Sequence, residues 1–148
     1  MPQYTTTIPC TWNVDEAFSY MSDFANARFW DPSVISAQRI DDGAVDENSE
    51  FELTVRVAGR DKVLRYRVTS LESPRVVTFT SSTTSLLSLD TLTFEPRTSG
   101  CEMTYSAELR FKGVAGVANP LLGLMFRRLG DRARDSLREV LGSPRATA

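Results

Sequence analysis

The sequence predicts an α+β fold in which one long amphipathic helix packs across an antiparallel sheet. Two patterns in the last third of the chain indicate this fold. Residues 102–111 alternate strictly between polar and apolar side chains, and residues from about 118 to 142 repeat apolar side chains at spacings of three and four. A sheet with one apolar face and a helix with one apolar stripe bury both surfaces by packing together. At 148 residues the chain is expected to form a single domain, residues 1–148, with room for a core and a cavity.

Two short helices are predicted between the first strand, residues 3–10, and the rest of the sheet. Asn13 is followed three residues later by Glu16, which is the pattern of a capping box at a helix start. The second short helix begins at Asp23 and ends at the Trp-Asp-Pro triplet of residues 30–32, because the residue before a proline is pushed out of the helical region.

Six further strands follow at the spacing of an antiparallel meander, separated by turns rich in Gly, Pro, Asp and Ser. Each strand has one apolar and one polar face, which is typical of a sheet that is covered on one side only. The expected strands are residues 34–40, 51–57, 64–69, 77–81, 90–94 and 102–111.

The last helix is predicted from about residue 118 to residue 142, and the tail, residues 143–148, is expected to be frayed. Pro120 suits a first-turn position, where its missing N–H has no partner to lose. The apolar stripe that should face the sheet consists of Leu122, Met125, Phe126, Leu129, Ala133, Leu137 and Val140.

Composition argues against several classes of function. Histidine is absent, which removes Ser-His-Asp triads, two-histidine metal sites and imidazole acid–base catalysis. The net charge of -2 gives no basic field for nucleic acid. No leader-like segment is present, and no apolar run approaches the roughly 20 residues that a membrane helix needs. We therefore expect a cytoplasmic protein with no metal site, no cofactor, no nucleic-acid partner and no stable membrane insertion. A homodimer is compatible with the sequence.

Several segments, taken in this order of elements, resemble a known family. They are Phe18 to Phe24 (FSYMSDF), Trp30-Asp31-Pro32, Ser88 to Pro96 (SLDTLTFEP), Leu109 to Gly113 (LRFKG) and Asn119 to Leu122 (NPLL). The chain resembles the START-like, Bet v 1-like (SRPBCC) superfamily in its bacterial polyketide cyclase/dehydrase-like branch. The resemblance implies a helix-grip fold, in which the seven-stranded sheet grips the last helix across its concave face. Members serve as aromatic cyclases and as lipid or hormone carriers, so the resemblance does not select one activity.

The strand order of that fold also makes a prediction about the two cysteines. The first and last strands pair antiparallel, so Cys10 and Cys101 are expected to be cross-strand neighbours. In a reducing cytosol they should remain thiols.

Three polar residues are candidates for orienting or transforming a ligand. Asp90 shares strand parity with Leu92 and Phe94, and a carboxyl that faces an apolar cavity has a raised pKa suited to proton transfer. The alternative is that Asp90, at the expected start of its strand, points to solvent. Tyr66 and Tyr105 lie on apolar faces, so each hydroxyl needs either a protein partner in the core or a ligand.

The remaining candidates form the walls of the expected cavity, although Trp30 is more simply explained as a core anchor between helix and sheet. The cavity is expected to hold roughly 300–1,000 Å³. Its predicted lining is Trp30, Val55, Tyr66, Phe79, Asp90, Leu92, Tyr105, Leu109, Leu122, Met125, Phe126 and Leu129.

Three hypotheses of function follow. The first is a carrier or sensor of a small hydrophobic ligand: a lipid, an isoprenoid or an aromatic, polyketide-like molecule. The second is an aromatase/cyclase-like enzyme in which Asp90, Tyr66 or Tyr105 moves a proton. The third is a protein interaction module whose cavity is filled by side chains. The sequence alone places no pair of carboxylates and no base–nucleophile pair, which favours the carrier.

Overall fold

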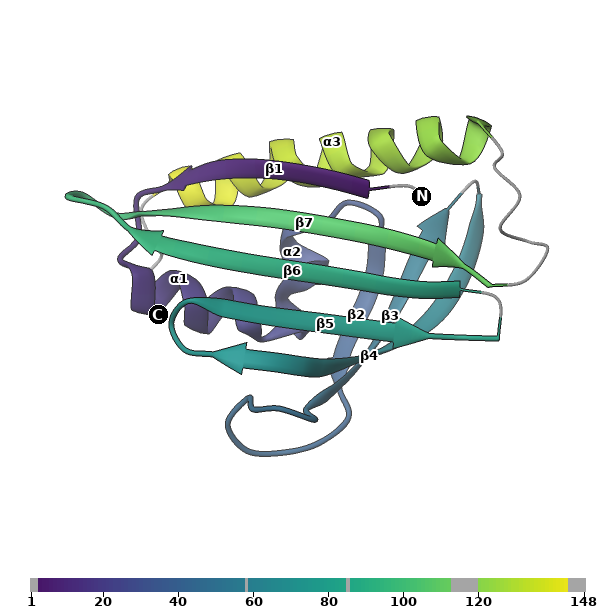
Figure 1. Cartoon of the computed structure of the whole chain (residues 1–148), viewed down its shortest axis with the longest axis horizontal. Coiled ribbons are helices and arrows are strands. Elements are labelled where there is room, and N and C mark those ends of the chain that lie inside the picture. The colour runs from purple at the N-terminus through teal and green to yellow at the C-terminus, as the bar shows by residue number, and fades with distance from the viewer. Residues whose placement is uncertain (1–2, 58, 85, 113–119, 144–148) are drawn as a thin grey trace.

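A seven-stranded antiparallel sheet curls around the helices of this protein (Figure 1). The computed structural model describes residues 3–57, 59–84, 86–112 and 120–143. The strands lie in the order β1-β7-β6-β5-β4-β3-β2, and the expected α+β helix-grip architecture is confirmed. The strands are β1 (Gln3–Cys10), β2 (Val34–Arg39), β3 (Glu50–Val57), β4 (Arg60–Glu72), β5 (Val76–Ser82), β6 (Leu86–Pro96) and β7 (Cys101–Phe111). The helices are α1 (Val14–Ser22), η1 (Phe24–Asn26), α2 (Ala27–Trp30) and α3 (Pro120–Gly142).

The short helices between β1 and β2 begin and end where their capping residues predict. The side chain of Asn13 accepts a hydrogen bond from the backbone N–H of Glu16 at 2.9 Å, which caps α1. The second expected helix is divided into the 3₁₀ turn η1 and the four-residue α2. Asp23 caps η1 by accepting from the backbone N–H of Ala25 at 3.2 Å. The chain then turns at Asp31 and enters β2, which brings the start of that strand against the concave face.

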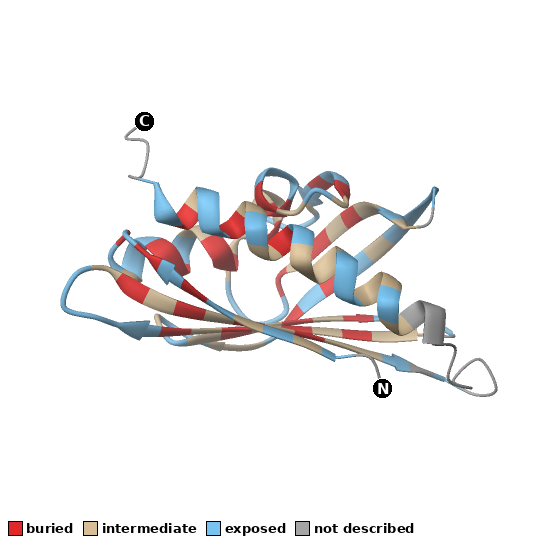
Figure 2. Cartoon of the chain, turned by 90° about the horizontal axis from the view of Figure 1, so that it is seen from above, coloured by how far each residue is buried: buried red, intermediate tan, exposed pale blue. Residues whose placement is uncertain are grey.

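The C-terminal half of α3 is anchored in the core. Ala133, Leu137 and Leu141 are buried, whereas Met125, Phe126 and Leu129 nearer the N-terminal end are only partly buried. Figure 2 shows this gradient along the helix. Leu141, four residues after Leu137, extends the buried stripe, and the expected Val140 is partly buried and packs against the same core. The expected Leu122 lies outside the residues whose side chains the structure describes.

Hydrogen bonds from Thr11 and Trp12 hold the C-terminal end of α3 to the segment that follows β1. The backbone N–H of Thr11 donates to the carbonyl of Leu141 at 2.9 Å, and the indole Nε1 of Trp12 donates to the carbonyl of Ser143 at 2.7 Å. These bonds satisfy carbonyls that a helix end leaves without intrahelical partners. One end of α3 is therefore fixed, while the other covers the sheet more loosely.

The cysteines are neighbours as predicted. Cys10 pairs with Cys101 across β1 and β7, and both are buried free thiols. Gly100, which precedes this pair, has a φ of +84°, and an added Cβ would overlap the carbonyl oxygen of Cys10. Glycine is therefore required at that turn.

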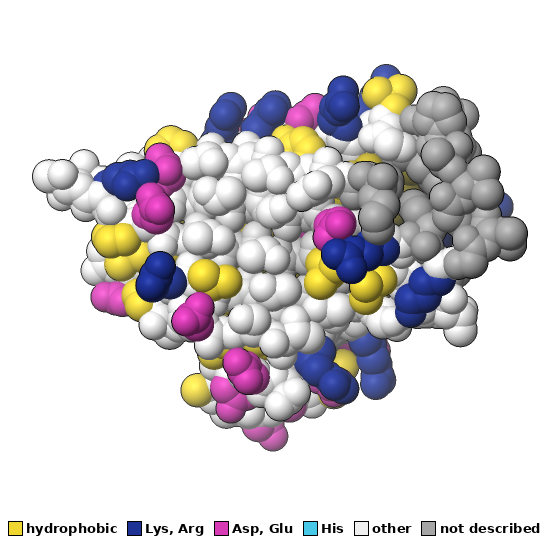
Figure 3. Space-filling view, in the orientation of Figure 1, with side chains coloured by type: hydrophobic (Ala, Val, Ile, Leu, Met, Phe, Trp, Pro, Cys, Tyr) yellow, Lys and Arg dark blue, Asp and Glu magenta, His cyan; other side chains and the backbone are white. Residues whose placement is uncertain are grey.

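The outer face of the sheet is polar, as the strand alternation predicts (Figure 3). Pairs of hydroxyl side chains run across neighbouring strands there, and each pair shares a hydrogen bond. They are Thr5 with Ser106, Thr7 with Thr104, Thr69 with Thr80, and Thr78 with Thr91. Among the described residues, no helix combines the length and the apolar character that crossing a membrane requires.

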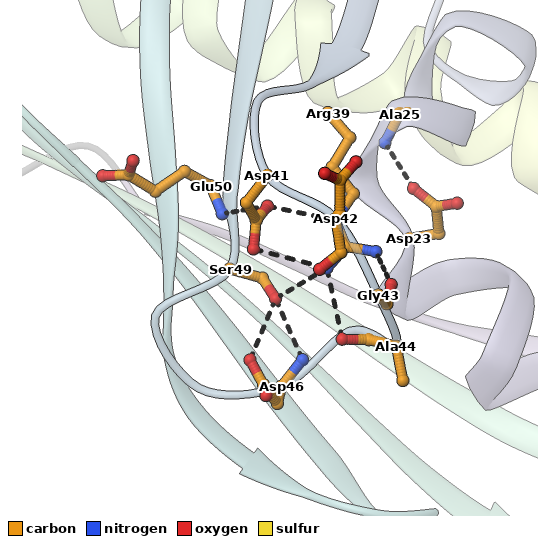
Figure 4. Close-up of polar contacts among 10 residues, drawn as sticks. All are labelled: Asp23, Ala25, Arg39, Asp41, Asp42, Gly43, Ala44, Asp46, Ser49 and Glu50. Atoms are coloured by element: carbon orange, nitrogen blue, oxygen red, sulfur yellow. Dashed lines mark hydrogen bonds and ion pairs between the residues drawn. The ribbon is translucent and has the colours of Figure 1, made fainter.

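One arginine organises the loop between β2 and β3 (Figure 4). The guanidinium of Arg39 donates to the carboxylate of Asp41, to the hydroxyl of Ser49 and to backbone carbonyls of residues 42–44. The Ser49 hydroxyl in turn accepts from the backbone N–H of Asp46 at 3.0 Å. These contacts satisfy the polar groups of the loop, and they fix the end of β2 opposite to the one that reaches the cavity.

Candidate functional site

A cavity of about 240 Å³, partly open to solvent, lies between the concave face of the sheet and the first half of α3. It is smaller than the expected 300–1,000 Å³ because aromatic rings occupy part of the concave face. Phe24 of η1 stacks on Phe79 with ring centres 4.1 Å apart and meets Tyr66 edge-on at 5.1 Å. The hypothesis of an interaction module expected side chains to fill this cavity completely. The structure instead leaves a cavity of about 240 Å³.

Most of the residues that the sequence proposed for the walls do line this cavity. The group comprises Val55, Tyr66, Asp90, Tyr105, Leu109, Met125, Phe126 and Leu129. Parity along the strands could have added three more, because Leu53, Leu64 and Ala107 share faces with proposed residues and also line the cavity.

Three proposed residues lie in the core instead of on the cavity wall. Trp30 is 1% exposed and packs edge-on against Tyr105 with ring centres 5.8 Å apart. Its indole Nε1 has no hydrogen-bond partner among the described residues. Phe79 is covered by Phe24, and Leu92 is fully buried. These three large side chains support the wall from behind. Leu122 was also proposed, and its side chain is outside the described part of the chain.

Asp90 lies in the middle of β6, not at its start, because this strand begins four residues earlier at Leu86. The alternation of the strand therefore holds at this position, and the carboxyl faces the cavity with only 6% of the residue exposed. Its Oδ1 accepts a hydrogen bond from the hydroxyl of Tyr105 at 3.2 Å. The pKa of Asp90 is raised to about 7, chiefly by burial; the hydrogen bond from Tyr105 lowers it, and the charge of the nearby Asp31 makes a smaller contribution that raises it.

The two tyrosines serve as neutral hydrogen-bonding groups. Tyr66 shares a hydrogen bond of 3.3 Å with the hydroxyl of Ser88. Burial first, and the Asp90 charge second, raise the pKa of both Tyr66 and Tyr105 above the usual value. Both phenols therefore stay protonated at neutral pH, so Asp90 is the group in this trio that can gain or lose a proton there.

Asp31 is a second carboxyl in the cavity, and the sequence reasoning missed it. Its Oδ1 accepts from the backbone N–H of Ser33 at 2.9 Å and from the Ser33 hydroxyl at 2.8 Å. Burial raises its pKa, while these two hydrogen bonds lower it. The sequence placed no carboxylate pair, and the structure corrects this, because Asp31 and Asp90 line one cavity. The signal in the sequence was the turn position of Asp31, three residues before β2, whose start lies on the concave face.

The polar groups of the cavity are concentrated around these two carboxyls, and the rest of the lining is largely apolar. Lys62 is the one basic residue in the described lining, and its side chain is exposed. Among the described residues, no three His, Cys, Asp or Glu side chains gather as a metal site would require. The arrangement can hold an apolar body and can present hydrogen-bond acceptors to one end of it.

Tyr4 closes one side of the cavity by joining β1 to α3. Its ring packs on Gly130, where an added Cβ would lie only 2.6 Å from ring carbons. Its hydroxyl donates to Oδ1 of Asp131 at 2.8 Å. Glycine at this position lets the helix approach β1 closely. Gly130 lies where the anchored half of α3, which includes Ala133, Leu137 and Leu141, meets the covering half, which includes Met125, Phe126 and Leu129.

Comparison with protein families gives one match that spans nearly the whole chain. Residues 1–142 match the model of the family described as polyketide cyclase/dehydrase and lipid transport. The chain belongs to this family, and membership implies a cavity that binds hydrophobic ligands. No curated protein matches the sequence closely enough to count as a relative.

Solved structures agree on the fold. A START superfamily protein from Mycobacterium smegmatis superposes with a TM-score of 0.77 at 12% identity, covering 95% of this chain and 97% of that one. The Zhui aromatase/cyclase from Streptomyces sp. R1128 gives 0.73 at 16% identity, with 95% and 91% covered. The major latex-like protein 151 of Panax ginseng gives 0.62 at 12% identity, with 92% and 96% covered. At such low identities these likenesses establish the architecture alone.

Proposed function

We propose that this member of the polyketide cyclase/dehydrase and lipid transport family carries or senses a small hydrophobic molecule in the cavity beneath α3. The ligand is a lipid, an isoprenoid or an aromatic, polyketide-like compound, and Asp90, Tyr66 and Tyr105 set its orientation. The observation that carries the proposal is the cavity itself, whose lining is apolar apart from a few polar groups. We propose that it works in the cytoplasm, without a cofactor and without inserting into a membrane.

The covering half of α3 supports this function. Met125, Phe126 and Leu129 keep part of their apolar surface exposed, although they belong to the stripe that faces the sheet. A bound apolar molecule would remove that surface from water, at roughly 25 cal/mol for each Å². Methionine adapts its shape to irregular neighbours, which suits a wall that must fit a guest.

Two experiments test the carrier. Native mass spectrometry of the purified chain should detect a co-purified small molecule. A neutral fluorescent probe such as N-phenylnaphthylamine should bind in the cavity and be displaced by the natural ligand. Ala107→Phe fills space at the cavity wall, so we expect probe affinity to fall at least about tenfold. Ser106→Phe, on the outer face of the same strand, is the matched control and should bind as the natural chain does. Equal probe binding by both variants would refute this placement of the ligand.

An aromatase/cyclase-like enzyme is the second candidate, and one observation favours it. Two carboxyls lie in one apolar cavity, and the pKa of Asp90 is about 7, which suits a group that exchanges protons at neutral pH. If Asp90 transfers a proton, Asp90→Asn should reduce turnover of a polyketone substrate by about 10²–10⁴-fold with little change in binding. Turnover that is unchanged in this variant would exclude Asp90 as the proton-transfer group.

A further inference from the structure

We propose that the two carboxyls of the cavity bind a protonated amino group, so that the preferred ligand is an amphiphilic amine: an apolar body that ends in an ammonium head. This inference rests on the proposed carrier function and names the chemical class of its ligand.

The geometry supplies two acceptors that no described residue uses. Asp90 reaches the cavity from β6, and Asp31 reaches it from the turn before β2. Their Oδ1 atoms accept hydrogen bonds from Tyr105 and from Ser33, respectively. The Oδ2 atom of each carboxyl accepts none from the residues that the structure describes. An ammonium group has three donors and no acceptor, so it matches these acceptors, and either Oδ2 atom can take one of its hydrogen bonds.

The charges point the same way. Lys62 is the one basic residue in the described lining, and it lies far along β4 from Asp90. Asp90 is in register with Phe79, which pairs with Val68, and Lys62 comes six residues before Val68. At about 3.3 Å per residue, Lys62 lies roughly 20 Å along β4 from Val68, the β4 residue that is level with Asp90. Asp90 is buried and Asp31 is half-buried. Carboxyls withdrawn from water without a cationic partner are unfavourable, and a cation bound in the same cavity compensates their charge. An anionic head group, such as that of a fatty acid, would be repelled.

The remaining cavity wall suits the other end of such a molecule. Val55, Leu64 and Phe126 are apolar and line the cavity beyond the carboxyls. A fused-ring or alkyl body placed there would gain by leaving water. An alcohol of the same shape would occupy this space equally well but would present one donor and no charge.

Binding of an ammonium group should also expel a proton. The ionisable groups that face Asp90 are Asp31 before β2, Tyr66 on β4, Tyr105 on β7, Tyr4 on β1 and the distant Lys62; the described lining from α3 contains no ionisable residue. The phenols remain neutral, so the proton comes from the carboxyls. Below the pKa of Asp90, an ammonium head therefore binds with proton release, and its affinity rises with pH until Asp90 is ionised.

Isothermal titration calorimetry with three probes of nearly equal shape tests the proposal. The probes are naphthylmethylamine, naphthylmethanol and naphthoate. At pH 7 the amine should bind about 10- to 100-fold more tightly than the alcohol, the advantage of hydrogen bonds to charged groups, and naphthoate should bind most weakly. At pH 6, titrations in buffers of different ionisation enthalpy should show net proton release for the amine and none for the alcohol.

Variants isolate the carboxyls. Asp90→Asn and Asp31→Asn each keep a side-chain oxygen for the existing hydrogen bonds, and each should cost the amine about 10-fold or more while changing the alcohol less than about 3-fold. Glu72→Gln removes an exposed carboxyl outside the cavity and should change neither. Circular dichroism of each variant verifies folding.

The outcomes separate this inference from the carrier function. If the alcohol binds and the amine gains no advantage, or if the Asn variants weaken both probes equally, the amine proposal is wrong and the carrier stands. If no probe binds the natural chain at millimolar concentration, the carrier function fails together with it.

Discussion

Replacing Asp90 by Asn should stabilise the protein at alkaline pH, because the carboxyl is ionised there in a buried site. The pKa of Asp90 rises from an ordinary 3.8 to about 7 in the folded chain, chiefly through burial. Between these two values the folded state holds more protons than the unfolded state. Stability therefore falls as pH rises through this window, and the full loss is reached above pH 7. A shift of about three units corresponds to about 4 kcal/mol.

Asparagine cannot ionise, and it keeps an oxygen that can accept the hydroxyl of Tyr105. At pH 8, Asp90→Asn should therefore unfold at a temperature roughly 10 °C higher than the natural chain, since 1 kcal/mol moves Tm by about 2–4 °C in a domain of this size. At pH 4.5 the difference should fall to about 1 kcal/mol, or about 2–4 °C, because Asp90 is then protonated in the folded chain and ionises only in the unfolded chain. Differential scanning calorimetry across this pH range measures both quantities.

Glu72→Gln removes an exposed carboxyl and serves as the control, with a Tm difference that stays near zero at both pH values. Burial of an ionised Asp90 is refuted if Asp90→Asn shows no gain in Tm at pH 8, or if its gain is the same at pH 4.5 as at pH 8. Either result would mean that water or a counter-charge reaches Asp90 and that the carboxyl is not desolvated.

Two further predictions concern packing and thiol chemistry. Gly130→Ala should destabilise the domain by about 1–3 kcal/mol in urea unfolding, because the added Cβ would press on the ring of Tyr4. Gly123→Ala lies in the same helix but meets open space, so it should stabilise the domain by about 0.5–1 kcal/mol. Equal effects of the two variants would show that Tyr4 does not pack on α3 in this way. Burial raises the pKa of the Cys10 thiol, and it raises the pKa of the Cys101 thiol to about 12. A thiol reagent at pH 8 should therefore modify the folded chain at least about 100-fold more slowly than the chain in denaturant. Rapid labelling of the native protein would contradict the buried β1–β7 pairing.

The elements that the sequence predicted correctly are those with a regular period. Alternation with period two identified the strand faces, and spacings of three and four identified α3. The same parity put Tyr105 on an apolar face and made Asp90 a candidate for that face, although the expected strand start at residue 90 left solvent as the alternative; the structure joins the two by a hydrogen bond. The cysteine register followed from the strand order, because neighbouring strands of known direction leave few alternatives.

Features that depend on how the chain bends were not predictable in this way. Asp31 lies in a turn, where no periodic pattern indicates a direction, and it reaches the cavity only because the chain from α2 into β2 folds over the concave face. The cavity volume depends on where the rings of Phe24 and Tyr66 meet. The position of Trp30 was not predictable either, since the sequence does not distinguish a large aromatic side chain that lines a cavity from one that packs in the core beside it.

The pair of carboxyls links the stability of this domain to its occupant. A core selected for stability alone would hold Asn or an apolar side chain at position 90, because a buried carboxyl without a cation is unfavourable at neutral pH. Asp90 nevertheless lies among apolar neighbours with Asp31 close enough to raise its pKa. A ligand that supplies a positive charge removes this penalty, so binding to the folded state and stabilisation of that state become one equilibrium. The occupied domain should therefore resist unfolding at the pH where the empty domain is weakest. At equal saturating concentrations, the stabilisation by an amine should exceed that by an alcohol by RT ln of the ratio of their affinities.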